Sequence, residues 1–344
     1  MTEFKGNRAI IIPTLVSILL LSIIGALFFG AYHLSIQEIW SAVFLNDNSA
    51  NRFLILQIRL PRIALSALIG AGLSVSGAAI QGLFRNPLAD QTLIGVTSGA
   101  MLFAVLSIVL SGSILAQLSE LFKQSTIALA AFIGGLLTTY LVYFLSSSDG
   151  RTKVTTMLLA GIAISAFAAA ISGIFIYLSD DEQLRDITFW SLGSFSGANW
   201  IQVLIVGPIV LIGIIGLMLR SKALNAILLG EKEAVYLGIE VEKVKSRVIL
   251  LTALMVGVCI AMSGIIGFVG LVIPHLLRLV FGTDYRLLLK ASVFLGAVFM
   301  IITDTLARTI VAPSELPIGI LTAMIGAPFF LWLLVKAQHQ NIAI

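Results

Sequence analysis

Long apolar runs separated by short polar segments organise the whole chain. The first run extends from Ala9 to Gln37 without an Asp, Glu, Lys or Arg. A helix needs about 20 apolar residues to cross a bilayer, and this run has no convincing cleavage site, so it predicts a retained first span and not a signal peptide. Nine further candidate spans cover residues 60–83, 93–112, 124–146, 154–178, 199–219, 246–265, 267–281, 287–308 and 316–336. The pattern predicts an all-α polytopic membrane protein with about ten transmembrane helices, forming a single transmembrane domain over residues 1–344.

Composition supports this prediction. Of the 344 residues, 59% are hydrophobic and 11% are charged, whereas a soluble protein carries roughly 25% charged residues. So few charges cannot coat a soluble globule, and intrinsic disorder requires the opposite composition. The basic residues are scattered without interleaved aromatic residues, so no nucleic-acid partner is expected. The lone Cys259 can form no internal disulfide and supports no metal site.

The Lys and Arg residues indicate how the spans are oriented. With the N-terminus in the cytoplasm, ten spans place fifteen of the 21 Lys and Arg residues on the cytoplasmic side and six on the other side. Cytoplasmic loops of membrane proteins carry such an excess. Both termini are therefore predicted to be cytoplasmic, and the net charge of +4 needs no anionic partner to explain it.

Three longer polar segments connect the spans. The largest cytoplasmic one covers residues 220–247, and its glycines Gly230 and Gly238 predict two short helices joined at a glycine. It is too small to be a catalytic domain. On the opposite side, residues 33–58 and 179–198 form the long segments.

A weak internal repeat is visible in the sequence. The pair Ser76-Gly77 is followed by Pro87, and the pair Ser263-Gly264 is followed at the same offset by Pro274. The two copies lie on spans of opposite direction, which predicts an inverted repeat of the kind common in transporters.

No residue pattern provides a source of energy. The chain lacks a GxxxxGK[ST] motif, so no nucleotide site of the P-loop kind is expected. Within the spans the acidic residue is Asp304, and its spacing to Arg308 predicts a local ion pair. The histidines His33, His275 and His339 lie near predicted interfaces and form no metal-ligand cluster. An energy-supplying partner is therefore implied, and no metal or cofactor is expected on this chain.

Arginines on the side that positive charge avoids require an explanation. The motif RLPR at residues 59–62 opens the second span, with Pro61 suited to a first helical turn. Snorkelling of Arg59 and Arg62 is one explanation. The other is a docking patch for an acidic partner surface, which Arg308 would extend.

At these positions the chain resembles the FecCD family, the permease subunits of ABC importers for iron chelates, haem and cobalamin. The resemblance covers about residues 50–336. Its motifs stand here as RLPR (59–62), SGAAIQGLFRNPLAD (76–90), LGEKEAVYLGI (229–239), GFVGLVIPHLLRL (267–279) and ELPIGILTAMIGAPFFLWLL (315–334). One departure is Gln91-Thr92, where the family usually has a proline after Asp90, which puts in doubt the turn before the third span.

The resemblance implies a permease that acts as a homodimer in the bacterial inner membrane. Its partners would be two cytoplasmic ATPase subunits, which use ATP and Mg²⁺, and a periplasmic or lipid-anchored binding protein. Spans five and ten would line most of the path. The arginines Arg59, Arg62 and Arg308 would meet acidic residues of the binding protein. Thr155 and Thr156 would lie at the cytoplasmic gate. ATPase coupling would fall to Gly230, Glu231, Ala234, Leu237 and Gly238 within the coupling helices of residues 220–247.

The cargo is less strongly indicated than the class. Residues 181–200 look most like haem permeases of the family, and Arg185 could contact a haem propionate, although pairing with Asp181 or Asp186 is favoured. A ferric siderophore and cobalamin stay as alternatives. Rival classes are a proton-coupled secondary transporter that uses Asp304 and Glu315, and a channel-like membrane protein.

Overall fold

The computed structural model describes residues 8–30, 32, 34–44, 50–114, 120–148 and 150–339. His33 lies outside these residues. Among the described residues, the regular secondary structure is helical apart from one short antiparallel hairpin of β1 (Ser147–Ser148) and β2 (Arg151–Thr152), which confirms the all-α prediction. Its helices are α1 (Arg8–Phe28), α2 (Ile36–Phe44), α3 (Ala50–Phe53), the π-helix η1 (Leu54–Arg59), α4 (Leu60–Leu83), the 3₁₀-helix η2 (Gln91–Ile94), α5 (Val96–Ile114), α6 (Glu120–Ser146), α7 (Val154–Tyr177), α8 (Asp181–Leu192), α9 (Trp200–Met218), α10 (Ser221–Leu229), α11 (Glu231–Tyr236), α12 (Val241–Ser263), α13 (Val269–Phe281), α14 (Tyr285–Ala307) and α15 (Ile318–His339).

A helix coincides with every predicted span. Among the described residues, seven helices are long and apolar enough to cross a membrane. Three shorter apolar helices, at Val96–Leu110, Val269–Phe281 and Ile318–Trp332, match the remaining predicted spans. The count of ten crossings and the cytoplasmic position of the termini stay predictions.

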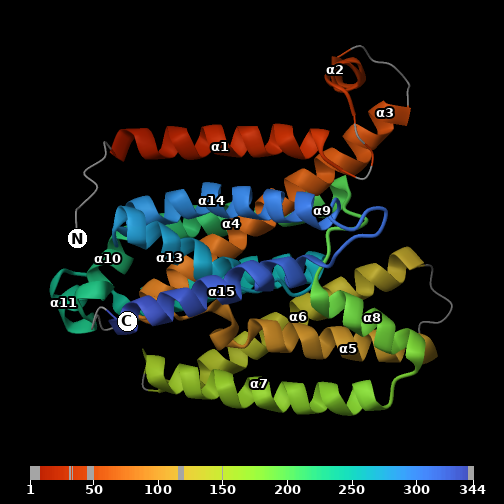
Figure 1. Cartoon of the computed structure of the whole chain (residues 1–344). Helices are drawn as coiled ribbons and strands as arrows, with labels where there is room; N and C mark the ends of the chain where they lie inside the picture. The colour runs from red at the N-terminus through yellow and green to blue at the C-terminus, as the bar shows by residue number, and fades with distance from the viewer. Residues whose placement is uncertain are drawn as a thin grey trace. The chain divides into compact units, whose positions relative to one another are not determined.

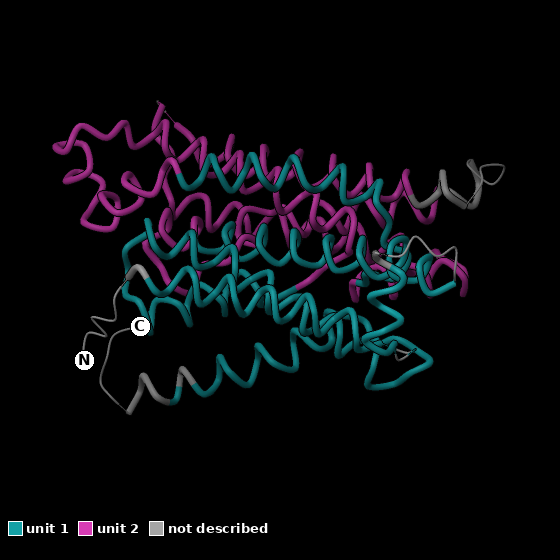
Figure 2. The backbone as a smooth tube through the Cα atoms, turned by 90° about the horizontal axis from the view of Figure 1, so that it is seen from above, with its two compact units in different colours: residues 1–78, 194–218, 267–344 teal, residues 79–193, 219–266 magenta. Residues whose placement is uncertain are grey.

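The chain divides into two compact units, coloured separately in Figure 2. Unit 1 contains residues 1–78, 194–218 and 267–344, and unit 2 contains residues 79–193 and 219–266. Each unit draws on segments that lie far apart in the sequence. The single permease domain over residues 1–344 stays a prediction.

Unit 1 is built on close packing of helices. Helix α1 lies along α14, and α13 packs against both α14 and α15 (Figure 1). Glycines let backbones approach: a Cβ on Gly77 of α4 would lie 1.9 Å from the carbonyl oxygen of Gly270 in α13. Gly70 of α4 and Gly296 of α14 make the same kind of contact. Such positions require glycine, because any side chain would push the two helices apart.

Unit 2 has the same construction. Helices α5 and α6 pack together along their length, α12 lies on α6, and α7 packs against both α5 and α6 (Figure 1). Buried Val105, Ile108 and Ile187 form an apolar cluster that joins α5 to α8. At Gly161 of α7, a Cβ would lie 2.0 Å from the carbonyl oxygen of Leu93 in η2, so α7 sits directly on that turn.

The two halves of the predicted repeat differ in local structure. Gly77 lies inside α4, whereas Gly264 ends α12 with a left-handed φ of 71°. Pro87 lies in the loop after α4, but Pro274 lies inside α13. The two motifs therefore occupy different local structures and lend no support to the inverted repeat.

Candidate functional site

One candidate site in unit 1 lies where η1 runs into α4. Arg59 is the last residue of the π-helix, and Arg62 lies in the first turn of α4, directly after Pro61. Proline has no N–H group to donate, and a π-helical turn is a common local adjustment at functional sites. Both arginine side chains are buried in unit 1. The wide turn thus brings two guanidinium groups into one interior region.

Arg62 bridges two carboxylates that come from distant parts of the chain. Its Nη2 atom donates to Asp304 Oδ1 at 2.8 Å, and its Nη1 atom donates to Glu315 Oε1 at 2.7 Å. Asp304 is buried in α14, and Glu315 lies in the loop before α15. The local ion pair of Asp304 with Arg308 that the sequence predicted is also present, but its 3.9 Å separation between Asp304 Oδ2 and Arg308 Nε is longer. The principal partner of Asp304 is therefore Arg62, which the local spacing could not reveal.

The other two arginines hold the end of α1. Arg59 donates to the carbonyl oxygens of Leu27 and Tyr32, and Arg308 donates to that of Ala26. The last carbonyls of a helix carry partial negative charge and attract cations. A Cβ on Gly30 would lie 3.1 Å from Arg59 and 3.2 Å from Arg308, so both guanidinium groups converge on this glycine.

The structure therefore brings the three predicted docking arginines together. It also turns them inward: Arg59, Arg62 and Arg308 are all buried within unit 1 and engaged with its own acceptors. They do not form an exposed basic patch in the single chain. Their role in docking a binding protein stays a prediction.

A second candidate site, in unit 2, is the coupling segment. Helices α10 and α11 are joined at Gly230, whose φ of 138° favours glycine, which confirms the two short helices predicted for this segment. Helix α12 begins at Val241, inside the predicted segment, so this helix starts five residues before the predicted span at residues 246–265. Lys243 and Lys245 belong to α12, but the predicted span began after them because it was placed on apolar residues.

The five predicted coupling residues differ in exposure. Leu237 is exposed, and Gly238 follows it with a φ of 79°. Ala234 and Gly230 are buried, and Glu231 forms an ion pair with Lys245. Neighbouring apolar side chains that the sequence did not single out face outward. The exposed apolar surface consists of Leu229 (70%), Val235 (58%), Tyr236 (89%) and Leu237 (63%).

Thr155 and Thr156 lie in the first turn of α7, immediately after the hairpin. Thr155 is exposed and Thr156 is half-buried. Most of the apolar surface of α7 is also exposed in the single chain, including Leu159, Ile162 and Phe167. Their assignment to a cytoplasmic gate stays a prediction.

The departure at Gln91 has a local structural consequence. Gln91 N donates to Asp90 Oδ1 at 2.8 Å, and this bond caps η2. A proline at position 91 could not make it, because proline has no N–H group. Burial raises the pKa of the Asp90 carboxyl, against the lowering effect of this hydrogen bond. The turn before α5 is thus capped by the Asp90 side chain, through a backbone N–H that any residue except proline would supply at position 91.

Arg185 lies on exposed α8, and its guanidinium carbon is 5.8 Å from the centre of the Phe189 ring. The favoured pairing with Asp181 or Asp186 is absent among the described residues, which corrects that expectation. Contact with an aromatic face leaves the polar edge of the guanidinium available. A contact with cargo stays a prediction.

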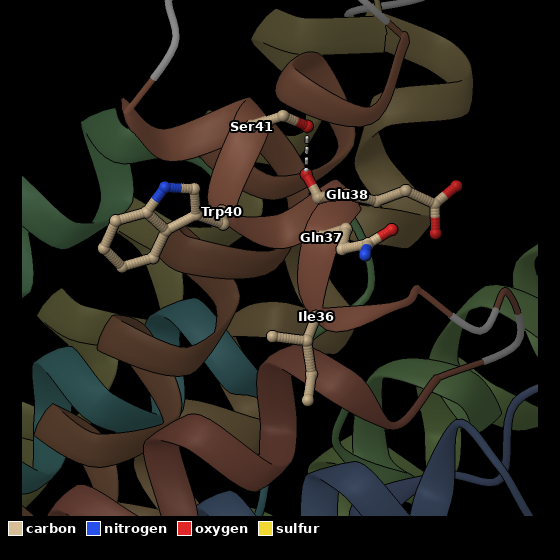
Figure 3. Close-up of a pocket in the computed structure, with 5 residues that line it drawn as sticks. All are labelled: Ile36, Gln37, Glu38, Trp40 and Ser41. Carbon is tan, nitrogen blue, oxygen red and sulfur yellow. Dashed lines mark hydrogen bonds between the residues drawn. The ribbon is translucent and has the colours of Figure 1, made fainter.

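Two other features carry no site. A shallow hollow of about 510 Å³ lies beside α2 and is lined by Ile36, Gln37, Glu38, Trp40 and Ser41. In Figure 3 the Trp40 indole and the Glu38 carboxylate point to opposite sides of the helix. The part of the chain that the structure describes contains no group of three metal-ligating side chains. The ring nitrogens of His275, within α13, have no hydrogen-bond partner among these residues.

These features define a helical, multi-pass membrane protein with charged contacts at helix ends and a short apolar surface on one connecting segment. The chain belongs to the FecCD transport family, which matches residues 18–336. It is a permease subunit of an ABC importer and has no catalytic role of its own within that family.

Several relatives cover nearly the whole chain. The hemin transport system permease HmuU of Yersinia pestis is 42% identical, over 95% of this chain and 96% of its own length. The cobalamin import permease BtuC of Halobacterium salinarum is 38% identical over 80% of this chain and 72% of its own length. An iron chelatin permease of Helicobacter pylori is 36% identical over 91% of this chain and 94% of its own length.

The fold is also found in a solved structure. A transporter assigned to the metal-chelate ABC type, in an inward-facing conformation, matches with a TM-score of 0.83 and 34% identity. The match covers 95% of this chain and 99% of the other.

Proposed function

We propose that the chain forms the membrane path of an importer that moves haem from the periplasm to the cytoplasm across the bacterial inner membrane. The main support for haem as the cargo is the 42% identity to a hemin permease over 95% of the chain. Residues 181–200, which form α8 and the turn after it, look most like haem permeases of the family. Arg185 on this segment is exposed and would attract a propionate.

Two ATPase subunits supply the energy in this proposal. The exposed apolar surface of Leu229, Val235, Tyr236 and Leu237 supports the interaction, because clustered apolar side chains on a polar connecting segment need a partner to cover them. Gly230 and Gly238 fix the ends of α11 by their left-handed backbone. ATP and Mg²⁺ bind to the ATPase subunits and not to this chain.

A binding protein and a second permease copy complete the assembly. Acidic residues of a periplasmic or lipid-anchored binding protein meet the cluster of Arg59, Arg62 and Arg308, and at Arg62 they displace the carboxylate of Glu315. The outward apolar side of α7, with Thr155 and Thr156 at its start, lines the path beside the second copy. The few charges along this path suit a large, flat, apolar cargo.

The alternatives predict different behaviour. A ferric siderophore or cobalamin would follow the same route, and permeases for both kinds of cargo, iron chelates and cobalamin, are among the relatives. A proton-coupled carrier would need Asp304 as a free proton site. Asp304 instead accepts hydrogen bonds from Arg62 at 2.8 and 3.0 Å, which favours the importer.

The cargo is tested with the cognate binding protein and the reconstituted complex. Haem, a panel of ferric siderophores and cobalamin are offered singly to the binding protein, with haem binding followed by its Soret band. ATP-dependent uptake into proteoliposomes is then measured for each cargo, and Arg185→Gln is compared with Asp186→Asn, its neighbour on α8. Haem uptake without siderophore or cobalamin uptake is expected. Preferential uptake of another cargo would overturn the haem assignment and leave the importer class intact.

A further inference from the structure

A buried lysine at the start of α12 holds three separate pieces of unit 2 together. Lys245 is 2% exposed, and its Nζ atom has three acceptors. It donates to Glu231 Oε2 at 2.8 Å, to Glu242 Oε1 at 3.0 Å and to the carbonyl oxygen of Thr152 at 2.9 Å. An ammonium group has three protons to donate, so the structure satisfies each of them.

The three acceptors belong to different elements. Glu231 is the first residue of α11, Glu242 lies in the first turn of α12, and Thr152 is the last residue of the hairpin that leads into α7. Glu242 strengthens the third connection, because its Oε2 atom accepts a hydrogen bond from Thr152 N at 2.8 Å. Lys245 and Glu242 thus hold both polar backbone groups of Thr152.

The short elements on either side depend on such contacts. Helix α11 has six residues, and a helix of that length is not stable by its own hydrogen bonds. The hairpin pairs only two residues of each strand. Since neither element is rigid alone, a charged link between them decides whether they move together.

The chemistry of the link suits transmission of force. A buried charge that loses its partners is costly, so Lys245 resists separation from Glu231 and Glu242. Both carboxylates are partly exposed, at 38% and 35% of their side chains. They can therefore stay hydrated while the lysine holds its place. A displacement of α11 would move Glu231, and Lys245 would transmit this movement to Thr152, which lies three residues before Thr155.

We propose that Lys245 is the positioning residue that transmits movement of α11 to the start of α7, and so couples ATP hydrolysis to opening of the path. This rests on the proposed function, in which α10 and α11 dock on the ATPase. It adds a residue outside the exposed docking surface whose role is to connect that surface to the gate helix.

The test uses the complete complex of two permease copies, ATPase subunits and binding protein in proteoliposomes. Lys245→Met removes the charge and keeps the length of the side chain. The number of cargo molecules transported for each ATP hydrolysed should fall by about tenfold, within the range of coupling between sites, while the complex still assembles and hydrolyses ATP. Lys245→Arg keeps the charge and should recover most of the ratio.

A matched control lies two residues away. Lys243 pairs with Glu240 on the surface, and both side chains are more than 60% exposed at 64% and 67%. Lys243→Met should leave the transport ratio unchanged. If Lys245→Met prevents assembly, Glu231→Gln carries the test, because it removes the charge of one acceptor of the lysine and leaves the other two acceptors unchanged.

The outcomes separate the inference from the function on which it rests. Wild-type complex without ATP-dependent uptake would overturn the proposed function itself. Coupled uptake by wild type, with the same ratio in Lys245→Met or Glu231→Gln, would overturn the role of Lys245 alone. The predicted result is fewer cargo molecules transported per ATP in Lys245→Met or Glu231→Gln, and a ratio close to that of wild type in Lys245→Arg.

Discussion

The carboxylate of Asp304 lies 2.8 Å from the guanidinium of Arg62, although 242 residues separate them in the chain. Both side chains are buried, so the pair fastens the start of α4 to the end of α14. Arg62 also holds Glu315 at 2.7 Å. This arrangement makes Asp304 a structural anchor and not a free carrier of protons.

Replacement of Asp304 by Asn should destabilise the protein without abolishing transport. The change leaves Arg62 with Glu315 alone and removes the nearest carboxylate of Arg308. Breaking a buried pair in this way costs about 3 kcal/mol of the free energy of unfolding, measured by denaturant titration in mixed micelles. Asp186→Asn, on exposed α8, is the control and should have no effect. Complete loss of transport by well-folded Asp304→Asn would favour the proton-coupled carrier.

Replacement of Glu315 by Gln should tighten binding of the cognate binding protein. Glu315 is partly exposed and occupies the Nη1 donor of Arg62, so an incoming carboxylate has to displace it. Removing its charge should raise the affinity about two- to fivefold, the equivalent of a partly exposed ion pair. Titration of the purified permease complex with the binding protein measures the change. Glu182→Gln on exposed α8 serves as control, and an unchanged or lower affinity for Glu315→Gln would argue against docking at Arg62.

Introduction of a charge on the exposed apolar surface should weaken association with the ATPase. Tyr236 is 89% exposed, so Tyr236→Asp should leave the permease stable. A buried aromatic anchor at an interface is worth about 2 kcal/mol or more, which a pull-down or a binding titration with the ATPase subunit would detect. Lys232→Ser, a polar change on the same helix, should bind normally. Equal binding by Tyr236→Asp and wild type would place the docking surface elsewhere.

A methyl group at Gly77 should separate two helices of unit 1. The added Cβ would meet the carbonyl oxygen of Gly270 at 1.9 Å, and backbone cannot move aside locally. Overpacking of this kind costs about 1–3 kcal/mol, seen as a lower thermal unfolding temperature of Gly77→Ala in detergent. Gly173→Ala in α7 is matched in chemistry, but nothing lies within 4 Å of its added Cβ. If both variants unfold at the same temperature, the close packing of α4 and α13 is not as described.

The length of the apolar runs predicts most of the helices. The span prediction required only that apolar runs be long enough for a bilayer, and α7 and α9 match it within a residue or two at their ends. The glycine at position 230 predicted the joint between α10 and α11, because a left-handed φ is unfavourable for other residues. These features depend on short stretches of sequence.

The charged contacts depend on the fold and were not predictable in the same way. Lys245 donates to the backbone carbonyl of Thr152 in the hairpin, 93 residues earlier in the chain. Asp304 had a plausible local partner in Arg308, and only the packing of α4 on α14 brings Arg62 closer. The exposed side of α11 was missed because Val235 and Tyr236 are unremarkable until Ala234 is known to face inward.

ATP dependence of haem uptake tests the central claim most directly. Proteoliposomes that contain the permease, its ATPase and the binding protein are loaded with ATP and Mg²⁺, and haem uptake is measured with and without a protonophore. The account predicts uptake that requires ATP, the ATPase and the binding protein, and that continues unchanged when the proton gradient is collapsed. Uptake by the permease alone, driven by a proton gradient and abolished by the protonophore, would contradict it.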